Sequence, residues 1–288
     1  MNLTTEPEES APARTSWILK DLPPYRPVAR KLMAITADPE VPLAEIQKVL
    51  RTDTAFTADV LRLANSPLIS STGVIRGVMH AIMMLGLERI KSLATTLALK
   101  SFLASGAPSD AIEICWRHNL ATASVCEKLA RHYQIDADAC YTAGLLHDVG
   151  RLALLRKSPD RYGKLLASAN ALDLDLLECE RELFDADHCQ AGKWVLEQWE
   201  FPKELCDVAA LHHTQPGPGA SDLLRIVYVG WQIADLLGFS AVNRPARGDI
   251  GAIVASLRGN VGRRVVEQFD GLADEVAFKI NAVECSLV

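Results

Sequence analysis

The chain has 288 residues, of which 49% are apolar and 23% charged, so it has an ordinary globular composition that suits one large domain or two modest ones. Its net charge of −6 argues against a broad nucleic-acid surface, because such surfaces are basic. There is no run of about 18 uncharged apolar residues, and Met1 is followed by an acidic polar stretch that is unlike a signal peptide. We therefore expect a cytoplasmic protein with no membrane partner.

The cysteines are odd in number and none of them forms a Cys-x-x-Cys pair. They are Cys115, Cys126, Cys140, Cys179, Cys189, Cys206 and Cys285. This pattern predicts reduced, mostly buried, small apolar side chains of an intracellular protein.

The first third of the chain has helical patterning. Residues 1–16 are rich in Glu, Pro, Ser and Thr and cannot bury a core, so we expect them to be disordered. Leu22-Pro23-Pro24 predicts an extended lead-in, because residues before proline avoid the helix. No convincing alternation of period two follows, which favours a helical unit. Helices are expected over residues 28–37, 42–51, 54–64, 78–85 and 87–102.

The rest of the chain is also expected to be helical, and several residues suit helix starts: Ser109, Asp136, Asp173 and Ser221. Gly150 and Arg151 are expected to pass into a short apolar turn that ends near residue 155. A Gly/Pro/Arg-rich link over 243–251 precedes the last helices. The helices are expected over residues 109–133, 136–147, 159–171, 174–184, 188–199, 202–213, 222–237, 250–257 and 261–283.

The dipeptide His147-Asp148 follows an apolar helical run and combines two kinds of metal ligand. Neutral imidazole suits Zn, Fe, Ni or Cu, and carboxylate oxygen suits harder ions such as Mg and Mn. The pair therefore suits a transition ion, and a carboxylate can bridge two of them. Five histidines lie at or near an expected helix end or on an inward helical face: His118, His147, His188, His212 and His213. His80 and His132 are expected to be structural.

Several separate motifs, in this order, resemble the HDOD family. They are Leu22-Pro23-Pro24, the helix that begins at Asp53, Leu61-Arg62-Leu63-Ala64-Asn65-Ser66, Ala81-Ile82-Met83-Met84-Leu85-Gly86 and Ala143-Gly144-Leu145-Leu146-His147-Asp148-Val149-Gly150-Arg151. The resemblance covers roughly residues 18–217. It implies an all-α fold in which an N-terminal helical unit, 18–106, packs on a half related to the HD phosphohydrolases, 107–217. Residues 218–288 would add C-terminal helices packed on that half.

The resemblance also implies a set of metal ligands. In catalytic HD domains the ligands are a histidine on one helix, the His-Asp pair and an aspartate on a later helix. Relatives of the HD-GYP class, which hydrolyse cyclic di-nucleotides, add histidines in the middle of the domain. The residues that stand in these places are His118, His147, Asp148, His188, His212, His213 and Asp235. They would hold one or two divalent ions of Fe, Mn, Zn or Ni, with Arg151 contacting a phosphate or another ligand.

Five of these residues also have a structural interpretation. The sequence is also consistent with His118 as a hydrogen-bonded core histidine and with His188 as a helix cap. Asp235 could be a solvated residue on an amphipathic helix. His212 and His213 end a helix, where cationic side chains suit the dipole. Since adjacent residues point in different directions, at most one of these two is expected to bind a metal ion.

Two departures weaken an enzymatic interpretation. Arg151 stands where lysine is usual after His-Asp-x-Gly, and a planar guanidinium differs in geometry from a point charge. The segment after His213 contains no Gly-Tyr-Pro. Members of the family are mostly bacterial, are thought to act in signalling and regulation, and mostly have no demonstrated catalytic activity. We therefore expect a non-catalytic regulatory protein that binds a signalling partner or a small, nucleotide-type ligand. The alternative is a metal-dependent phosphohydrolase acting on a nucleotide or cyclic di-nucleotide.

Overall fold

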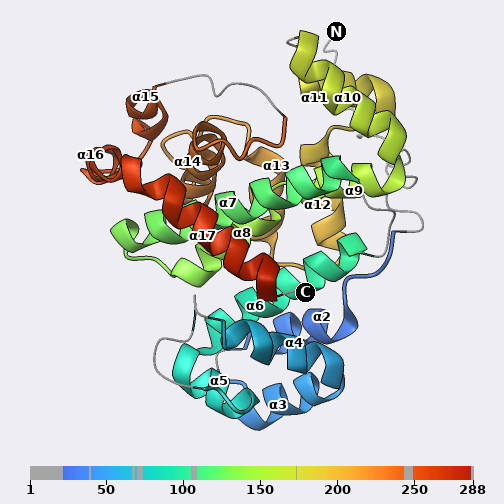
Figure 1. The fold of residues 1–288 in the computed structure, drawn as a ribbon, viewed down its shortest axis with the longest axis vertical. Coiled ribbons are helices and arrows are strands. Elements are labelled where there is room, and N and C mark those ends of the chain that lie inside the picture. Colours follow the sequence, from blue (N-terminus) through green and yellow to red (C-terminus); the bar gives the residue numbers. More distant parts are fainter. Residues whose placement is uncertain are drawn as a thin grey trace, which may run out of the picture.

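The computed structural model describes residues 22–38, 40–66, 69, 74–104, 109–172, 174–242 and 249–286 (Figure 1). Within these ranges the regular elements are helices and no strand occurs, which confirms the all-α prediction. None of the described helices has the length and apolar character of a membrane span. The predicted disordered tail, residues 1–16, and residues 243–248 of the predicted link lie outside the described residues.

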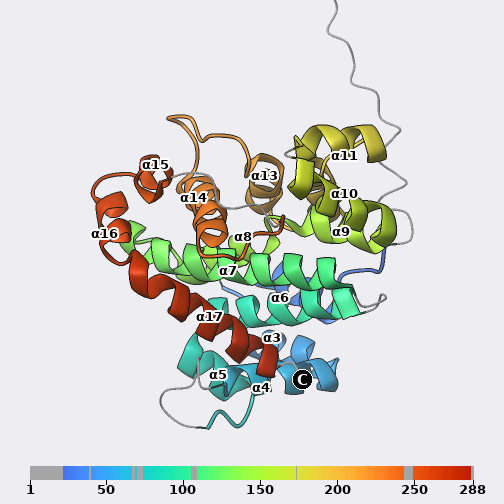
Figure 2. The same ribbon diagram turned by 45° about the horizontal axis from the view of Figure 1, so that its top comes forward.

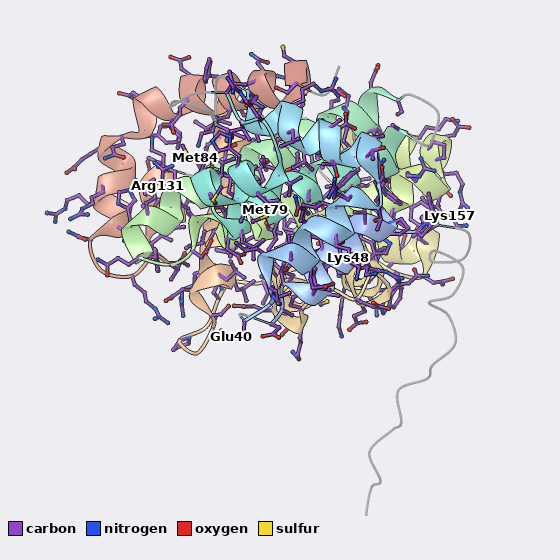
Figure 3. All side chains as sticks on the ribbon, turned by 90° about the horizontal axis from the view of Figure 1, so that it is seen from below. Glu40, Lys48, Met79, Met84, Arg131 and Lys157 are labelled. Atoms are coloured by element: carbon purple, nitrogen blue, oxygen red, sulfur yellow. The ribbon has the colours of Figure 1, made fainter. Side chains whose placement is uncertain are left out.

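The N-terminal helices lie in the lower part of Figure 1 and are α2 (Pro27–Ile35), α3 (Leu43–Arg51), α4 (Thr54–Ala64), α5 (Val78–Leu85) and α6 (Leu87–Ala104). Their boundaries follow local chemistry. Asp53 caps α4 by accepting the Phe56 N–H at 2.9 Å, and Gly86 ends α5 with a φ of 84°. The unit faces the viewer in Figure 3, where Met84 of α5 is on the surface and 50% exposed.

The HD-like half is built around the long helix α7 (Asp110–Tyr133), which crosses the middle of Figure 2. Glycines let two helices approach it closely: a Cβ atom at Gly144 would lie 2.8 Å from the Ala123 Cα, and one at Gly230 would lie 2.5 Å from the Cys126 Sγ. The other helices of this half, including those that carry the glycines, are α8 (Ala137–Leu146), α9 (Val149–Lys157), α10 (Pro159–Leu172), α11 (Leu176–Phe184), α12 (His188–Gln198), α13 (Lys203–Leu211) and α14 (Asp222–Leu236).

The turn predicted at Gly150 and Arg151 is wrong, because these residues lie within helix α9. A Cβ atom at Gly150 would lie 1.9 Å from the His188 carbonyl oxygen and 2.4 Å from the Gly192 nitrogen. The glycine therefore permits close packing of α9 on α12 and does not bend the chain. This packing brings Arg151 and His188 to the same place.

The N-terminal unit and the HD-like half share one hydrophobic core. At one seam Tyr25 stacks on Trp199 with ring centroids 4.9 Å apart, and Phe102 meets the same indole edge-on at 5.1 Å. At another seam the buried Glu127 of α7 accepts from Arg89 of α6 at 2.8 Å. The packing of the two units that the resemblance implied is confirmed, whereas the exact domain boundaries stay predictions.

Two helix predictions in the second half need correction. Helix α11 begins at Leu176 behind the cap Asp175, and the predicted cap Asp173 lies outside the described residues. The predicted single helix over 261–283 is divided into α16 (Val261–Glu267) and α17 (Phe269–Ser286), after a short α15 (Ile250–Val254). The division lets α16 pack beside α15 while α17 crosses α7 and reaches α4. At the crossing with α7, Lys279 of α17 donates to Glu127 at 3.3 Å.

Candidate metal and ligand site

A cavity of about 300 Å³ lies in the HD-like half, bordered by helix ends and by α7 and α14. All the site residues predicted from the sequence line it: His118, His147, Asp148, Arg151, His188, His212, His213 and Asp235. They come from helices that are far apart in the chain, so the fold brings the predicted set together. Whether these residues bind a metal ion stays a prediction.

The first group of possible ligands is His118, His147 and Asp148, each of which offers one donor atom within 4.8 Å of the others. His147 ends α8, and its Nδ1 lies 2.6 Å from the Gly144 carbonyl oxygen. His118 Nδ1 lies 2.8 Å from the Phe239 carbonyl oxygen. Since a carbonyl only accepts, each Nδ1 donates and each Nε2 is left for a ligand, as in metal-binding histidines.

Burial keeps one of these imidazoles neutral. It lowers the pKa of His147 well below the usual histidine value, and the neighbouring His212 lowers it further. A neutral imidazole is the form that binds a metal ion. By contrast, burial raises the pKa of Asp235, whose carboxylate lies 3.4 Å from His118 Nδ1.

Arg151 forms a buried ion pair with Asp148, which links the two halves of the cavity. Its Nε donates to Asp148 Oδ2 at 2.6 Å, and the side chains are 4% and 1% exposed. Burial alone would raise the pKa of Asp148, but the guanidinium and the nearby histidines hold it well below its usual range. The other oxygen, Oδ1, is buried and has no hydrogen-bond partner among the described residues.

The same guanidinium also contacts His188, with its Nη2 3.2 Å from His188 Nε2. An arginine only donates, so in the neutral ring Nε2 accepts and the proton is on Nδ1. That Nδ1 lies 2.7 Å from Glu180 Oε2, which also accepts the His188 backbone N–H at 2.8 Å. Glu180 therefore fixes the ring and its tautomer, as outer carboxylates do for metal-binding histidines.

Glu180 was not predicted from the sequence, although a signal for it exists. It lies four residues from both Leu176 and Phe184, on the inward face of α11, and its side chain is fully buried. A carboxylate in an apolar stripe needs buried partners. Tyr162 supplies one of them by donating to Glu180 Oε1 at 2.5 Å.

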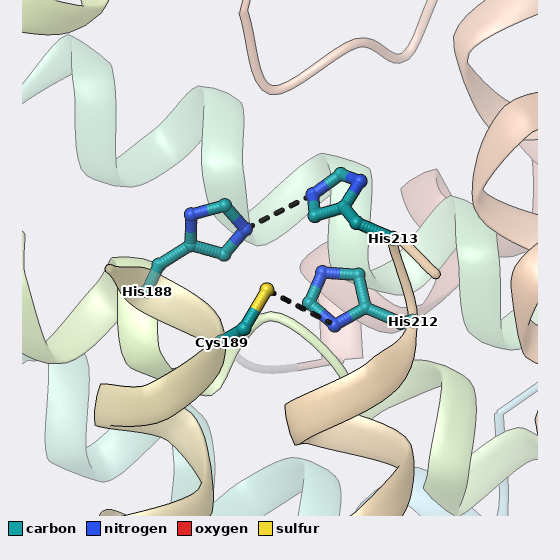
Figure 4. Close-up of side chains that lie close together, drawn as sticks. All are labelled: His188, Cys189, His212 and His213. Carbon is teal, nitrogen blue, oxygen red and sulfur yellow. Dashed lines mark hydrogen bonds between the residues drawn. The ribbon is translucent and has the colours of Figure 1, made fainter. Parts of the chain in front are cut away.

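The second group of possible ligands is His188, Cys189, His212 and His213, which we call the His/Cys cluster (Figure 4). His188 and Cys189 begin α12, and His212 and His213 follow α13. Both adjacent histidines reach the cavity, with ring centroids 4.3 Å apart, because the helix ends before them. Cys189 was predicted only as a small apolar residue, and its position next to His188 was the signal available.

The donors suit one metal ion better than a bridged pair. Asp148 Oδ1 and His212 Nε2 are buried atoms with no hydrogen-bond partner in the described part of the chain, so each suits a metal ion as a ligand. A carboxylate that bridges two ions with one oxygen on each needs both oxygens free, and Asp148 Oδ2 is held by Arg151. The residues therefore fit one ion better than a pair bridged by the two oxygens of Asp148.

Comparisons with known proteins agree with the fold and the motifs. A family model described as the HDOD domain matches residues 22–215. A solved HDOD domain protein of unknown function from Geobacter sulfurreducens is 21% identical, with a TM-score of 0.74, and the match covers 91% of this chain and 97% of that one. A candidate phosphohydrolase from Shewanella amazonensis SB2B is 20% identical, with a TM-score of 0.72 and coverages of 95% and 98%.

A candidate signal transduction protein from Marinobacter aquaeolei VT8 is 22% identical, with a TM-score of 0.73, and the match covers 92% of this chain and 60% of that one. At these identities the likenesses establish the fold alone. No curated protein matches the sequence. The family model spans most of the chain and confirms the resemblance seen in the motifs, so the chain belongs to the HDOD domain family.

Proposed function

We propose that this chain is a regulatory protein of the HDOD type that binds a signalling partner or a small ligand without turning it over. The buried ion pair between Arg151 and Asp148 carries this proposal. In a hydrolase with two metal ions, Asp148 would be the carboxylate that bridges them. Here the fixed cation of Arg151 is bound to that carboxylate instead.

Two physical effects follow from the position of Arg151. The guanidinium holds one oxygen of Asp148 by a hydrogen bond and an ion pair, which makes that oxygen a weaker ligand for a metal ion. It also lies 3.2 Å from His188 Nε2, so its positive charge already offsets part of the negative charge that a second metal ion would need at this end of the cavity. Both effects disfavour a pair of metal ions that clamps a phosphoryl group and its attacking water.

The cavity suits a small polar ligand. Its volume of about 300 Å³ is at the lower end of small-molecule sites. The wall holds both donors and acceptors of hydrogen bonds, and the Trp231 ring, 4.7 Å from that of His213, offers a flat apolar surface. These features support a nucleotide-type ligand, with a partner protein responding to its binding.

A metal-dependent phosphohydrolase is the second candidate, and one observation favours it. Asp148 Oδ1 and His212 Nε2 are buried without hydrogen-bond partners among the described residues, and they lie on the same cavity as His118 and His147. A single ion there would supply Lewis acidity toward a phosphoryl oxygen and lower the pKa of a bound water.

The two candidates are separated by a turnover assay. The metal-free protein would be loaded in turn with Fe, Mn, Zn and Ni and incubated with phosphodiesters that include cyclic di-nucleotides. We expect no more product than from His147→Ala and Asp148→Ala. Product that both substitutions abolish would overturn the regulatory proposal, whereas product that survives both would come from a contaminant.

A further inference from the structure

We infer that Cys189 binds metal through its thiolate and that the His/Cys cluster is a site for one zinc-type cation, with three nitrogens and one sulfur as ligands. The inference rests on the metal-capable cavity of the proposed function and adds the sulfur ligand, the class of metal and the number of ions. The cluster shares no residue with the group formed by His118, His147 and Asp148, which lines the same cavity.

The four side chains converge on one space between the start of α12 and the end of α13 (Figure 4). His188 Nε2 and His213 Nε2 are 3.0 Å apart, and Cys189 Sγ is 4.0 Å from His212 Nδ1. One donor atom from each residue lies within 4.8 Å of the other three. A tetrahedral zinc site with bonds of about 2.0–2.3 Å has donor spacings of ~3.3–3.8 Å, so shifts on the order of 1 Å would close the cluster around an ion.

The histidines already have the orientation that a ligand needs. Glu180 holds the Nδ1–H of His188, so Nε2 is the nitrogen that would bind the ion, in exchange for its contact with Arg151 Nη2 at 3.2 Å. His212 Nδ1 lies 2.9 Å from the Ala209 carbonyl oxygen, so its Nε2 is the free nitrogen, and this buried atom has no partner within the described ranges. In Figure 4 that nitrogen faces the space between His188 and His213.

The charges around the cluster favour a divalent cation. Three charged groups lie close to His188: Glu180 at 2.7 Å, Asp148 at 3.6 Å and Arg151 at 3.2 Å. With neutral imidazoles these groups sum to one negative charge, and a Cys189 thiolate makes two. A divalent ion balances that charge inside a buried site, where unbalanced charge is costly.

The donor set also selects the class of metal. Thiolate and imidazole together suit zinc, whereas Mg and Mn prefer oxygen ligands. Cys206 provides a comparison on the adjacent helix, since it is also buried but its Sγ donates to the Phe201 carbonyl oxygen at 3.6 Å. Cys189 is the cysteine whose sulfur lies beside the histidines.

Cobalt(II) reports on sulfur ligation without depending on activity. The full-length metal-free protein would be titrated with Co(II), and the sulfur-to-cobalt charge-transfer absorption recorded in the near ultraviolet. We expect the band to saturate at one equivalent and to vanish when one equivalent of Zn(II) is added. Cys206→Ser should keep the band, whereas Cys189→Ser should lose it and bind Zn(II) more than ~10-fold more weakly.

The absence of this band from the wild-type protein, or its survival in Cys189→Ser, would overturn the inference. If Cys189→Ser fails to fold, zinc-edge X-ray absorption of the wild-type protein decides: one sulfur at about 2.3 Å supports the site, and a shell without sulfur overturns it. Failure of the proposed function would look different, because phosphodiester turnover by the zinc form would contradict the regulatory proposal and leave the sulfur ligand in place.

Discussion

Replacing Arg151 with methionine should destabilise the protein strongly, because it leaves Asp148 charged and buried without its counter-ion. The Arg151 and Asp148 side chains are 4% and 1% exposed, so the carboxylate has little contact with bulk water, although both side chains border the cavity. Removing one partner of a buried pair costs about 3–5 kcal/mol. With a shift of about 2–4 °C per kcal/mol, the Tm should fall by roughly 6–20 °C.

The assay is urea unfolding followed by circular dichroism, arranged as a double-mutant cycle with Asp148→Asn. Because the asparagine carries no charge, Arg151→Met should cost far less in that background, with a coupling free energy of about 2–3 kcal/mol. Arg181→Met is the matched control, since this arginine pairs with Asp187 on the surface and its side chain is 51% exposed, so its loss should cost less than about 1 kcal/mol. A loss of unfolding free energy below about 1 kcal/mol for Arg151→Met, or an equal loss in both backgrounds, would show that Asp148 does not depend on Arg151 as its counter-ion.

Three further predictions concern packing, metal content and pH. Gly150→Ala should lower the free energy of unfolding, measured by urea denaturation, by about 1–3 kcal/mol, because its Cβ would meet the His188 carbonyl. The control is Gly163→Ala, whose Cβ would have nothing within 4 Å, so this substitution should be neutral or stabilising. The Arg151→Met protein should bind a second equivalent of metal ion, because the substitution frees Asp148 from the ion pair. Elemental analysis measures the number of bound ions, and the same number as in the wild-type protein would contradict this prediction. At Glu127, burial raises the pKa, but the neighbouring lysine and arginine outweigh it and lower the pKa below 4.5. Its stabilisation is therefore present above pH 4.5 and lost as the pH falls through the lower folded-state value. The difference in unfolding free energy between wild type and Glu127→Gln should shrink over that range, and a difference independent of pH would count against the ion pair.

Most of the helices could be predicted because their ends depend on local residues. Asp53, Asp136 and Ser221 are in place as N-caps whose side chains accept a backbone N–H. Gly150 shows the limit of such reasoning. Glycine indicates a turn when only its neighbours are considered, and its role in the fold depends on α12, which begins 38 residues later in the chain.

Some features of the functional site could likewise be predicted from local sequence, whereas others depend on packing. The motif order placed all eight predicted residues, and every one of them lines the cavity. Arg151 was expected to contact a ligand, but its side chain turns onto Asp148 three residues earlier, and that direction depends on the packing of α9. Glu180 and Cys189 each had a sequence signal, but their partners belong to other helices, so the sequence could not name those partners.

Metal positions in crystals of the full-length protein grown with excess zinc and manganese would show whether the cavity holds one sulfur-bound ion or a bridged pair. Anomalous scattering at the zinc edge should reveal one ion bonded to the Cys189 sulfur, with the Arg151 guanidinium still on Asp148. Two ions about 3.5–4 Å apart and bridged by Asp148, with Arg151 displaced, would contradict both the single-ion site and the regulatory proposal, and would indicate a hydrolytic centre.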